Sequence, residues 1–290
     1  MTAGYDIPVF KMNGLGNQIL VADMRASQGT LSGTQIRTIA EHPRTYFDQL
    51  MALHLPGIKD TVARVTIHNT DGSEAGACGN GMRCVAKIMG DGLKPLNFET
   101  KSGILNASFT EDGTITVDMG KPKFLWHEIP LRDEFFDTTK IELQVGPIDS
   151  PVLHSPSVCN MGNPHAVFWV QDIDDQALDK FGPMLENHPI FPERANITVA
   201  RILQPDRVQT RTWERGVGLT QACGSAACAV VACGIRTDRL KRNTTVLVPG
   251  GELGISWPSD TSGVLMSGPA ELEYKGIIKV AADGALLFEV

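Results

Sequence analysis

The sequence repeats a set of landmarks at an interval of half its own length. The tripeptide Ala-Cys-Gly occurs at 77–79 and again at 222–224. The two cysteines, Cys78 and Cys223, are therefore separated by 223 − 78 = 145 positions in a chain of 290 residues. Repeat units of solenoids run to about 50 residues, so an interval this long predicts a duplicated domain.

Further landmarks keep the same order in both halves. A Gly-Asn pair occurs at 16–17 and again at 162–163, with 163 − 17 = 146. Each cysteine lies nine residues after a polar residue that closes a strand-like run, Asn69 in VTIHN and Glu214 in TRTWE. Because these landmarks recur in the same order and at nearly the same interval, they predict two homologous halves related by a pseudo-twofold axis. Each half would supply one cysteine.

Hydrophobic periodicity predicts an α+β fold rich in strands. Alternating apolar and polar residues indicate strands at 62–68 and 208–213, and further strands are expected at 98–109, 114–119 and 246–257. Helices are expected directly after the cysteines, at 81–89 and 225–236, and the second is apolar on all sides, as buried helices are. We therefore expect two pseudo-symmetric domains, each a mixed, strongly curved, barrel-like β-sheet wrapped around a central helix. The first would span 1–122, completed by strands at 270–290, and the second 123–269.

Composition narrows the choice of partners and compartment. The net charge of −7 and the pI of about 5.5 argue against nucleic acid or an anionic membrane as a partner. The N-terminal residues show no signal-peptide pattern, and no apolar run approaches the roughly 18 residues of a membrane span. We expect a cytoplasmic protein whose six cysteines are thiols. Because no CxxC pair occurs and no histidine lies near the cysteines at ligand spacing, we expect no metal site.

A cysteine at the start of a buried helix can do chemistry. The helix N-terminus favours negative charge, which would lower the pKa of Cys78 and Cys223 below that of an ordinary thiol. The same backbone N–H groups could hold a carboxylate. Two such helix starts around one amino-acid α-carbon could remove its proton on one face and return a proton on the other. The four remaining cysteines are expected to be inert or structural: Cys84, Cys159, Cys228 and Cys233.

Several sequence blocks resemble the diaminopimelate epimerase family over nearly the whole chain. The resemblance is carried by KMNGLGN (11–17), FDQL (47–50), NTDGSEAGACGNGMRC (69–84), MGNPHAVF (161–168), FPERANI (191–197) and WERGVGLTQACGSAACA (213–229). It implies a cofactor-independent isomerase that converts LL-2,6-diaminoheptanedioate to the meso form, in lysine and peptidoglycan precursor biosynthesis. It also implies a homodimer.

The resemblance also implies roles for individual residues. Cys78 and Cys223 would be the catalytic pair, tuned or oriented by His165 and Glu214. Tyr274 matches a residue implicated in dimerisation. The residues that would bind substrate are Asn17, Gln49, Asn69, Gly79, Asn80, Asn163, Asn196, Glu214, Arg215, Gly224 and Ser225.

Alternatives remain open at this stage. A proline or hydroxyproline racemase of the same fold also uses two cysteines, but it favours histidine where this chain has Asn80. A phenazine-biosynthesis-like isomerase also shares the fold, but such proteins lack the cysteine pair. A thiol redox protein could use Cys78 and Cys223 as a reversible disulfide, although redox pairs normally lie in CxxC. The chain departs from the family at Gln18, Leu219 and Lys275, where the family usually has Asp, Glu and Asp, and these departures concern the pocket edge and the dimer.

Overall fold

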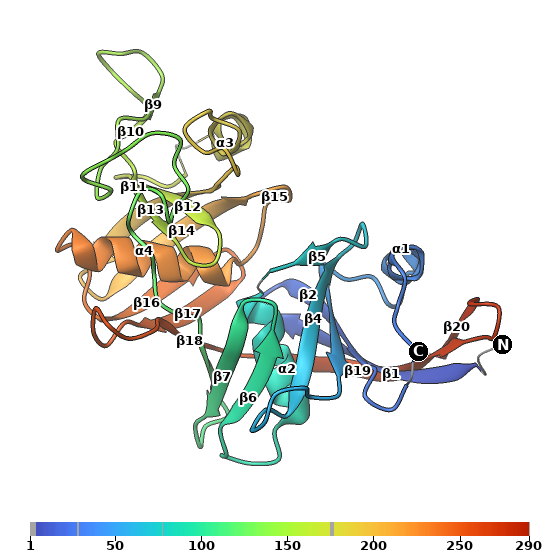
Figure 1. The fold of residues 1–290 in the computed structure, drawn as a ribbon. Coiled ribbons are helices and arrows are strands. Elements are labelled where there is room, and N and C mark those ends of the chain that lie inside the picture. The colour runs from blue at the N-terminus through green and yellow to red at the C-terminus, as the bar shows by residue number, and fades with distance from the viewer. Residues whose placement is uncertain (1–3, 28, 77, 175–176, 290) are drawn as a thin grey trace. The chain divides into compact units, whose positions relative to one another are not determined.

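The computed structural model describes residues 4–27, 29–76, 78–174 and 177–289, so Ala77 of the first Ala-Cys-Gly motif lies outside the described residues. The chain divides into two compact units (Figure 1). One unit comprises Met1–Val117 with Gly268–Val290, and the other comprises Asp118–Ser267.

The first unit is a mixed sheet with a helix on each face. Its strands run in the order β20-β19-β1-β2-β3-β4-β6-β7-β8, and the short β5 pairs with β4. The strands are β1 (Tyr5–Gly14), β2 (Asn17–Asp23), β3 (Gln49–His54), β4 (Ala63–Asn69), β5 (Glu74–Ala75), β6 (Leu96–Thr100), β7 (Gly103–Phe109), β8 (Ile115–Asp118), β19 (Glu271–Val280) and β20 (Leu286–Glu289). The helices are α1 (Gly33–Glu41) and α2 (Gly79–Met89).

The second unit is built in the same way. Its sheet order is β11-β12-β13-β14-β16-β17-β18, with the short β15 paired to β14. The strands are β9 (Gln144–Val145), β10 (Leu153–His154), β11 (Ser157–Asn160), β12 (Pro164–Trp169), β13 (Asn196–Gln204), β14 (Arg207–Glu214), β15 (Gly218–Leu219), β16 (Asn243–Val248), β17 (Gly251–Ser256) and β18 (Leu265–Gly268), of which β9 and β10 form a separate pair. The helices are α3 (Leu178–Glu186) and α4 (Gly224–Arg236).

The two sheets share one pairing pattern. From β1 to β8, and from β11 to β18, successive neighbours pair antiparallel, parallel, antiparallel, parallel, antiparallel and antiparallel. The helices keep the sequence interval: α1 and α3 start 178 − 33 = 145 residues apart, and α2 and α4 start 224 − 79 = 145 apart. The predicted α+β fold with two repeated, curled mixed sheets is confirmed.

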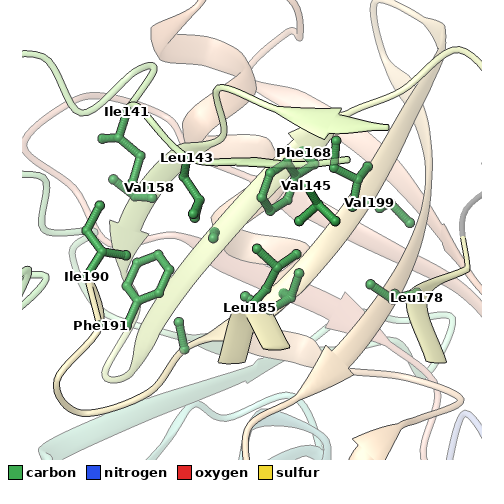
Figure 2. Packing of buried hydrophobic residues seen from close by; sticks show 14 of the residues in the cluster. Ile141, Leu143, Val145, Val158, Phe168, Leu178, Leu185, Ile190, Phe191 and Val199 are labelled. Atoms are coloured by element: carbon green, nitrogen blue, oxygen red, sulfur yellow. The ribbon is translucent and has the colours of Figure 1, made fainter. Parts of the chain in front are cut away.

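Each sheet is covered on both faces. In β2, Leu20 and Ala22 join the cluster that includes Ile36 and Ile39 of α1. The alternate residues of β2 point to the opposite face, where α2 packs against β1, β2 and β3. In the second unit, Leu178 and Leu185 of α3 pack with Phe168 of β12 and Val199 of β13 (Figure 2). Helix α4 packs on β11, β12, β13 and β17.

The helices after the cysteines begin slightly earlier than predicted. Helix α2 begins at Gly79 and α4 at Gly224, because Cys78 and Cys223 are themselves the N-caps, with extended backbone. The expected apolar character of the second helix is confirmed, since most of α4 is buried. Helices α1 and α3 were not expected. Each is the crossover that a parallel strand pair requires, β2 to β3 and β12 to β13.

Candidate active site

Cys78 caps the helix that lies against the first sheet. Its Sγ accepts a hydrogen bond from the backbone N–H of Gly81 at 3.2 Å. The first turn is tightly packed, since a Cβ added at Gly81 would lie 2.5 Å from Met51 Sδ and 3.1 Å from Cys78 Sγ. Gly79 and Asn80 are buried behind the cysteine. A backbone N–H that points at Sγ favours the thiolate, and it fixes where the sulfur lies.

Cys223 is likewise the N-cap residue of α4, but it lacks the side-chain capping hydrogen bond of Cys78 and has different surroundings. The residue is 7% exposed, and Ser225 Oγ lies 3.5 Å from its Sγ. Burial raises the pKa of the Cys223 thiol, and the nearby carboxylate of Glu214 raises it further. The hydroxyl of Ser225 and the amide of Ala226 act in the opposite direction, with smaller effect. The expectation that the helix start lowers the pKa of Cys223 is therefore wrong, because burial and an adjacent negative charge outweigh the helix dipole.

The predicted polar residues of the first unit lie at one end of its central strands. Gln49 begins β3, where it pairs with Asn69 of β4, and Asn17 begins β2 beside it. Since Leu50 and Ala52 face α1, alternation turns Gln49 to the face that α2 covers. Asn17 Nδ2 donates to Asp48 Oδ2 at 3.3 Å, while its buried Oδ1 has no hydrogen-bond partner among the described residues. That acceptor suits an N–H donor on a ligand.

Asn69 and Asn80 are placed by their neighbours. Asn69 Nδ2 donates to Ser73 Oγ at 3.0 Å, which orients its amide at the end of β4. A Cβ added at Gly14, the β1 partner of Asn17, would lie 3.4 Å from Asn80 Cβ. The first turn of α2 therefore lies over the strand end that carries Asn17.

The second unit places Asn163, His165 and Asn196 at the equivalent end. His165 of β12 pairs with Asn196 of β13 and donates from Nε2 to Asn163 Oδ1 at 2.7 Å. His165 Nδ1 is then the lone-pair nitrogen, and this buried atom has no partner among the described residues. Burial, assisted by the charge of Arg215, lowers the pKa of His165 to about 3. The imidazole is therefore neutral at physiological pH, so it can orient or polarise a neighbour without carrying a charge.

Asn196 connects two parts of the unit. Its Nδ2 donates to Pro164 O at 3.0 Å, and its Oδ1 accepts the backbone N–H of Arg215, also at 3.0 Å. The side chain is 2% exposed. Asn196 therefore holds the start of β12 and the turn after β14 in place, and a substrate contact would use its second N–H.

Glu214 is the last residue of β14, and Arg215 follows it. Thr220 Oγ1 donates to Glu214 Oε1 at 2.6 Å, and the carboxylate also acts on Cys223. Arg215 Nη1 donates to Glu193 O at 2.9 Å. The second unit thus places a carboxylate, a guanidinium and a neutral histidine at the sheet end where Cys223 begins its helix.

The remaining predicted residues are the other four cysteines and Tyr274. All six cysteines are thiols. Cys84, Cys159, Cys228 and Cys233 are fully buried, and burial raises the pKa of Cys84 to about 12, as expected of inert residues. Tyr274 lies on β19 opposite Lys11, and its buried Oη has no hydrogen-bond partner among the described residues.

Other features of the structure lie apart from the predicted residues. A cavity of about 330 Å³ in the second unit is lined by Lys140, Trp169 and Arg239 among others, and by none of the predicted site residues. Within the described ranges, no group of three or more His, Cys, Asp or Glu could hold a metal ion. No helix in the same ranges has the length and apolar character of a membrane span.

Two residues that the sequence reasoning missed support the site. Gly81 leaves room for Cys78 Sγ and Met51. A comparison of the two halves could have pointed to this glycine, because the equivalent position of the second unit is Ala226 (226 − 81 = 145). Glu186 is a buried carboxylate at the end of α3 that bonds to the turn carrying Arg215. Its surroundings, ENHP, look like an exposed turn, so sequence alone gave no sign of its burial.

Comparison with solved structures identifies the fold. The chain matches a hydroxyproline epimerase from Agrobacterium vitis with a TM-score of 0.66 at 13% identity, over 97% of this chain and 94% of that one. It matches a phenazine biosynthesis protein of the PhzF family from Enterococcus faecalis with a TM-score of 0.62 at 14% identity, over 94% and 99%. The fold is therefore the one shared by the PhzF proteins and the racemases of the proline type.

Sequence comparison identifies the family. The diaminopimelate epimerase family model matches residues 9–125 and 157–273. A diaminopimelate epimerase of Brucella anthropi is 56% identical over 269 residues, 92% of this chain and 89% of that protein. One of Rhizobium meliloti is 54% identical over 278 residues, 95% and 92%. The chain belongs to the diaminopimelate epimerase family, a family of isomerases, and the resemblance noted from its motifs is confirmed.

Proposed function

We propose that this chain interconverts LL-2,6-diaminoheptanedioate and its meso isomer by proton transfer between substrate and two thiols. Cys78 and Cys223 are N-cap residues at equivalent positions of two sheets that share one strand-pairing pattern, and this observation carries the proposal. One sulfur would act as base on one face of the α-carbon while the other returns a proton on the opposite face. The two cysteines then exchange protonation states, so the enzyme works in both directions.

The reacting amino-acid end would be held by the two helix starts. Backbone N–H groups at Gly79–Asn80 and Gly224–Ser225 belong to first helical turns, which lack intrahelical partners and favour an anion. They would bind the α-carboxylate and disperse the charge that grows on it as the proton leaves.

The far amino-acid end would bind polar residues of both units. Arg215 would pair with its carboxylate, and Glu214 with its ammonium. Asn17, Gln49, Asn69, Asn163 and Asn196 would supply neutral donors and acceptors. Asn17 Oδ1 and His165 Nδ1 are buried acceptors without partners among the described residues, so each could accept a hydrogen bond from a substrate N–H or from a thiol.

Glu214 and His165 would control the Cys223 thiol. The carboxylate and the buried setting hold Cys223 in its protonated form, ready to donate. His165 stays neutral, so it would contribute an oriented lone pair rather than a charge. In the wider setting, the product would serve lysine and peptidoglycan precursor synthesis in the cytoplasm. The active enzyme would be a homodimer with Tyr274 near the interface.

An isotope experiment tests the proposal. Enzyme and LL-diaminopimelate in heavy water should yield meso product with deuterium at the inverted α-carbon. Cys78→Ala and Cys223→Ala should abolish this conversion, whereas Cys84→Ala, which removes a buried thiol from the same helix as Cys78, should retain it. Turnover of L-proline or trans-4-hydroxy-L-proline without turnover of diaminopimelate would assign the chain to a racemase of the proline type instead.

A further inference from the structure

The carboxylate of Glu186 collects three hydrogen bonds around the turn that carries Glu214 and Arg215. It lies at the end of α3 and is 5% exposed. Its Oε2 accepts from Trp213 Nε1 at 2.7 Å. Its Oε1 accepts from the backbone N–H of Gly216 at 2.9 Å and from Arg194 Nη1 at 3.2 Å. One side chain therefore holds the residues immediately before and after the Glu214–Arg215 pair.

The same turn is held from a second direction. Asn196 Oδ1 accepts the backbone N–H of Arg215 at 3.0 Å, and Arg215 Nη1 donates to Glu193 O at 2.9 Å. The bonds of Glu186 and Asn196 leave the backbone of Glu214–Gly216 little freedom to shift. The side chain of Arg215 is then oriented by the segment before β13 rather than by solvent.

The fold does not itself require a buried carboxylate here. The equivalent position of the first unit is Glu41, at the end of α1 (186 − 41 = 145), and Glu41 is exposed. Burying a charge is unfavourable unless hydrogen bonds and a counter-charge compensate for the lost hydration. The buried carboxylate occurs in the unit that also carries the Glu-Arg pair.

We propose that Glu186 is a positioning residue, which fixes Glu214 and Arg215 so that they receive the far amino-acid end of the substrate. This inference rests on the proposed function. The hydrogen bonds of Glu186 go to Arg194 and to the turn at 213–216, so it would act through that turn rather than on the reacting carbon.

Replacing Glu186 by Gln is the sharpest perturbation, because the two side chains have nearly the same shape. A carboxylate accepts at both oxygens, whereas an amide accepts at one and donates at the other. In either orientation, the amide NH₂ faces a donor: Trp213 Nε1 on one side, or the N–H of Gly216 and the guanidinium of Arg194 on the other. At least one of the bonds that hold the turn must therefore break.

Steady-state kinetics of Glu186→Gln test the proposal. The KM for diaminopimelate should rise about tenfold or more, because Arg215 loses its place at the far end and far-end contacts bind ground and transition states alike. The change in kcat should be smaller, about threefold or less, because Thr220 Oγ1 still holds the Glu214 carboxylate that acts on Cys223. Two control variants should leave both constants within about twofold. Glu41→Gln alters the exposed equivalent, and Glu99→Gln alters a buried carboxylate whose Oε1 accepts from Gly57 N and Thr61 Oγ1 in the first unit.

A double-mutant cycle shows whether the effect passes through Arg215. On an Arg215→Lys background, Glu186→Gln should raise KM less than about threefold further, since the guanidinium is already gone and only Glu214 is left to be displaced. Fully additive effects would overturn the proposal, as would an unchanged KM in the single variant. Should Glu186→Gln fold poorly, Arg194→Gly removes one partner at a position with φ 59, which glycine tolerates, and KM should rise by a smaller factor.

Hydrogen exchange separates this inference from the proposed function. Either the amide of Gly216 or the indole N–H of Trp213 should exchange faster in Glu186→Gln than in the parent, whichever substrate the enzyme uses, because the glutamine amide keeps only one of these two bonds. An inactive parent with this faster exchange would refute the proposed function and leave the contact network standing. An active parent with unchanged exchange and unchanged KM in the variant would refute the positioning role alone.

Discussion

The neutral, buried His165 should make the stability of the second unit depend on pH in a calculable way. Its pKa is lowered from 6.5 to about 3, so between these values the unfolded chain binds a proton that the folded chain does not. Stability must then fall as pH falls below about 6.5, by about 1.4 kcal/mol per pH unit, until the folded-state pKa is reached. Between pH 7 and pH 5, this one group should lower the free energy of unfolding by about 2 kcal/mol.

The comparison variant is His165→Gln, which keeps an N–H donor for Asn163 but does not titrate. All four tryptophans, Trp126, Trp169, Trp213 and Trp257, lie in Asp118–Ser267, so their fluorescence reports unfolding of the second unit. Urea titrations at pH 7 and pH 5 should show that the parent loses about 2 kcal/mol more than the variant on acidification. The exposed His154→Gln should behave like the parent. Equal losses in the parent and His165→Gln would refute the reasoning.

Further predictions concern the two helix starts. Gly81→Ala should lower kcat by about tenfold or more, because the added Cβ collides with Met51 and Cys78 Sγ. The equivalent change in the second unit, Ala226→Gly, should cost about 1 kcal/mol of helix stability and leave kcat within about threefold. Glu214→Gln should speed alkylation of Cys223 by iodoacetamide at neutral pH, since removal of the carboxylate lowers the pKa of that thiol, and an unchanged rate would contradict this cause. Mild oxidation should inactivate the enzyme reversibly by forming a Cys78–Cys223 disulfide. If mass spectrometry of the oxidised, inactive protein finds no cross-linked peptide, the two thiols do not come within bonding distance.

The repeat in the sequence predicted more of the fold than local patterns did. The 145-residue interval between Cys78 and Cys223 implied equivalent halves, and the structure shows the same pairing pattern and helix spacing in both. Helix α1 was missed although Ser32 and Gln35 form a capping box, which is a readable signal. Helix α3 has no side-chain cap and contains Pro183, so only its interval from α1 could have revealed it.

The site was predicted unevenly, for physical reasons. Motif blocks identified the residues at the strand ends, because those blocks coincide with the ends of β4 and β14 and with the starts of α2 and α4. The pKa of Cys223 could not be predicted, since it depends on burial and on the approach of Glu214, both of which arise from tertiary packing. Glu186 escaped notice for the same reason: its three donors, Arg194, Trp213 and Gly216, come together only in the folded unit.

The central claim is that two thiols, one from each repeated sheet, exchange a proton with one carbon. Its most direct test is the fate of the α-hydrogen of LL-diaminopimelate in heavy water, with the parent enzyme and with Cys78→Ala and Cys223→Ala. The parent should introduce one solvent deuterium at each inverted centre, and neither variant should form deuterated meso product. Inversion that retains the original hydrogen, or normal turnover in either cysteine variant, would contradict the two-thiol mechanism.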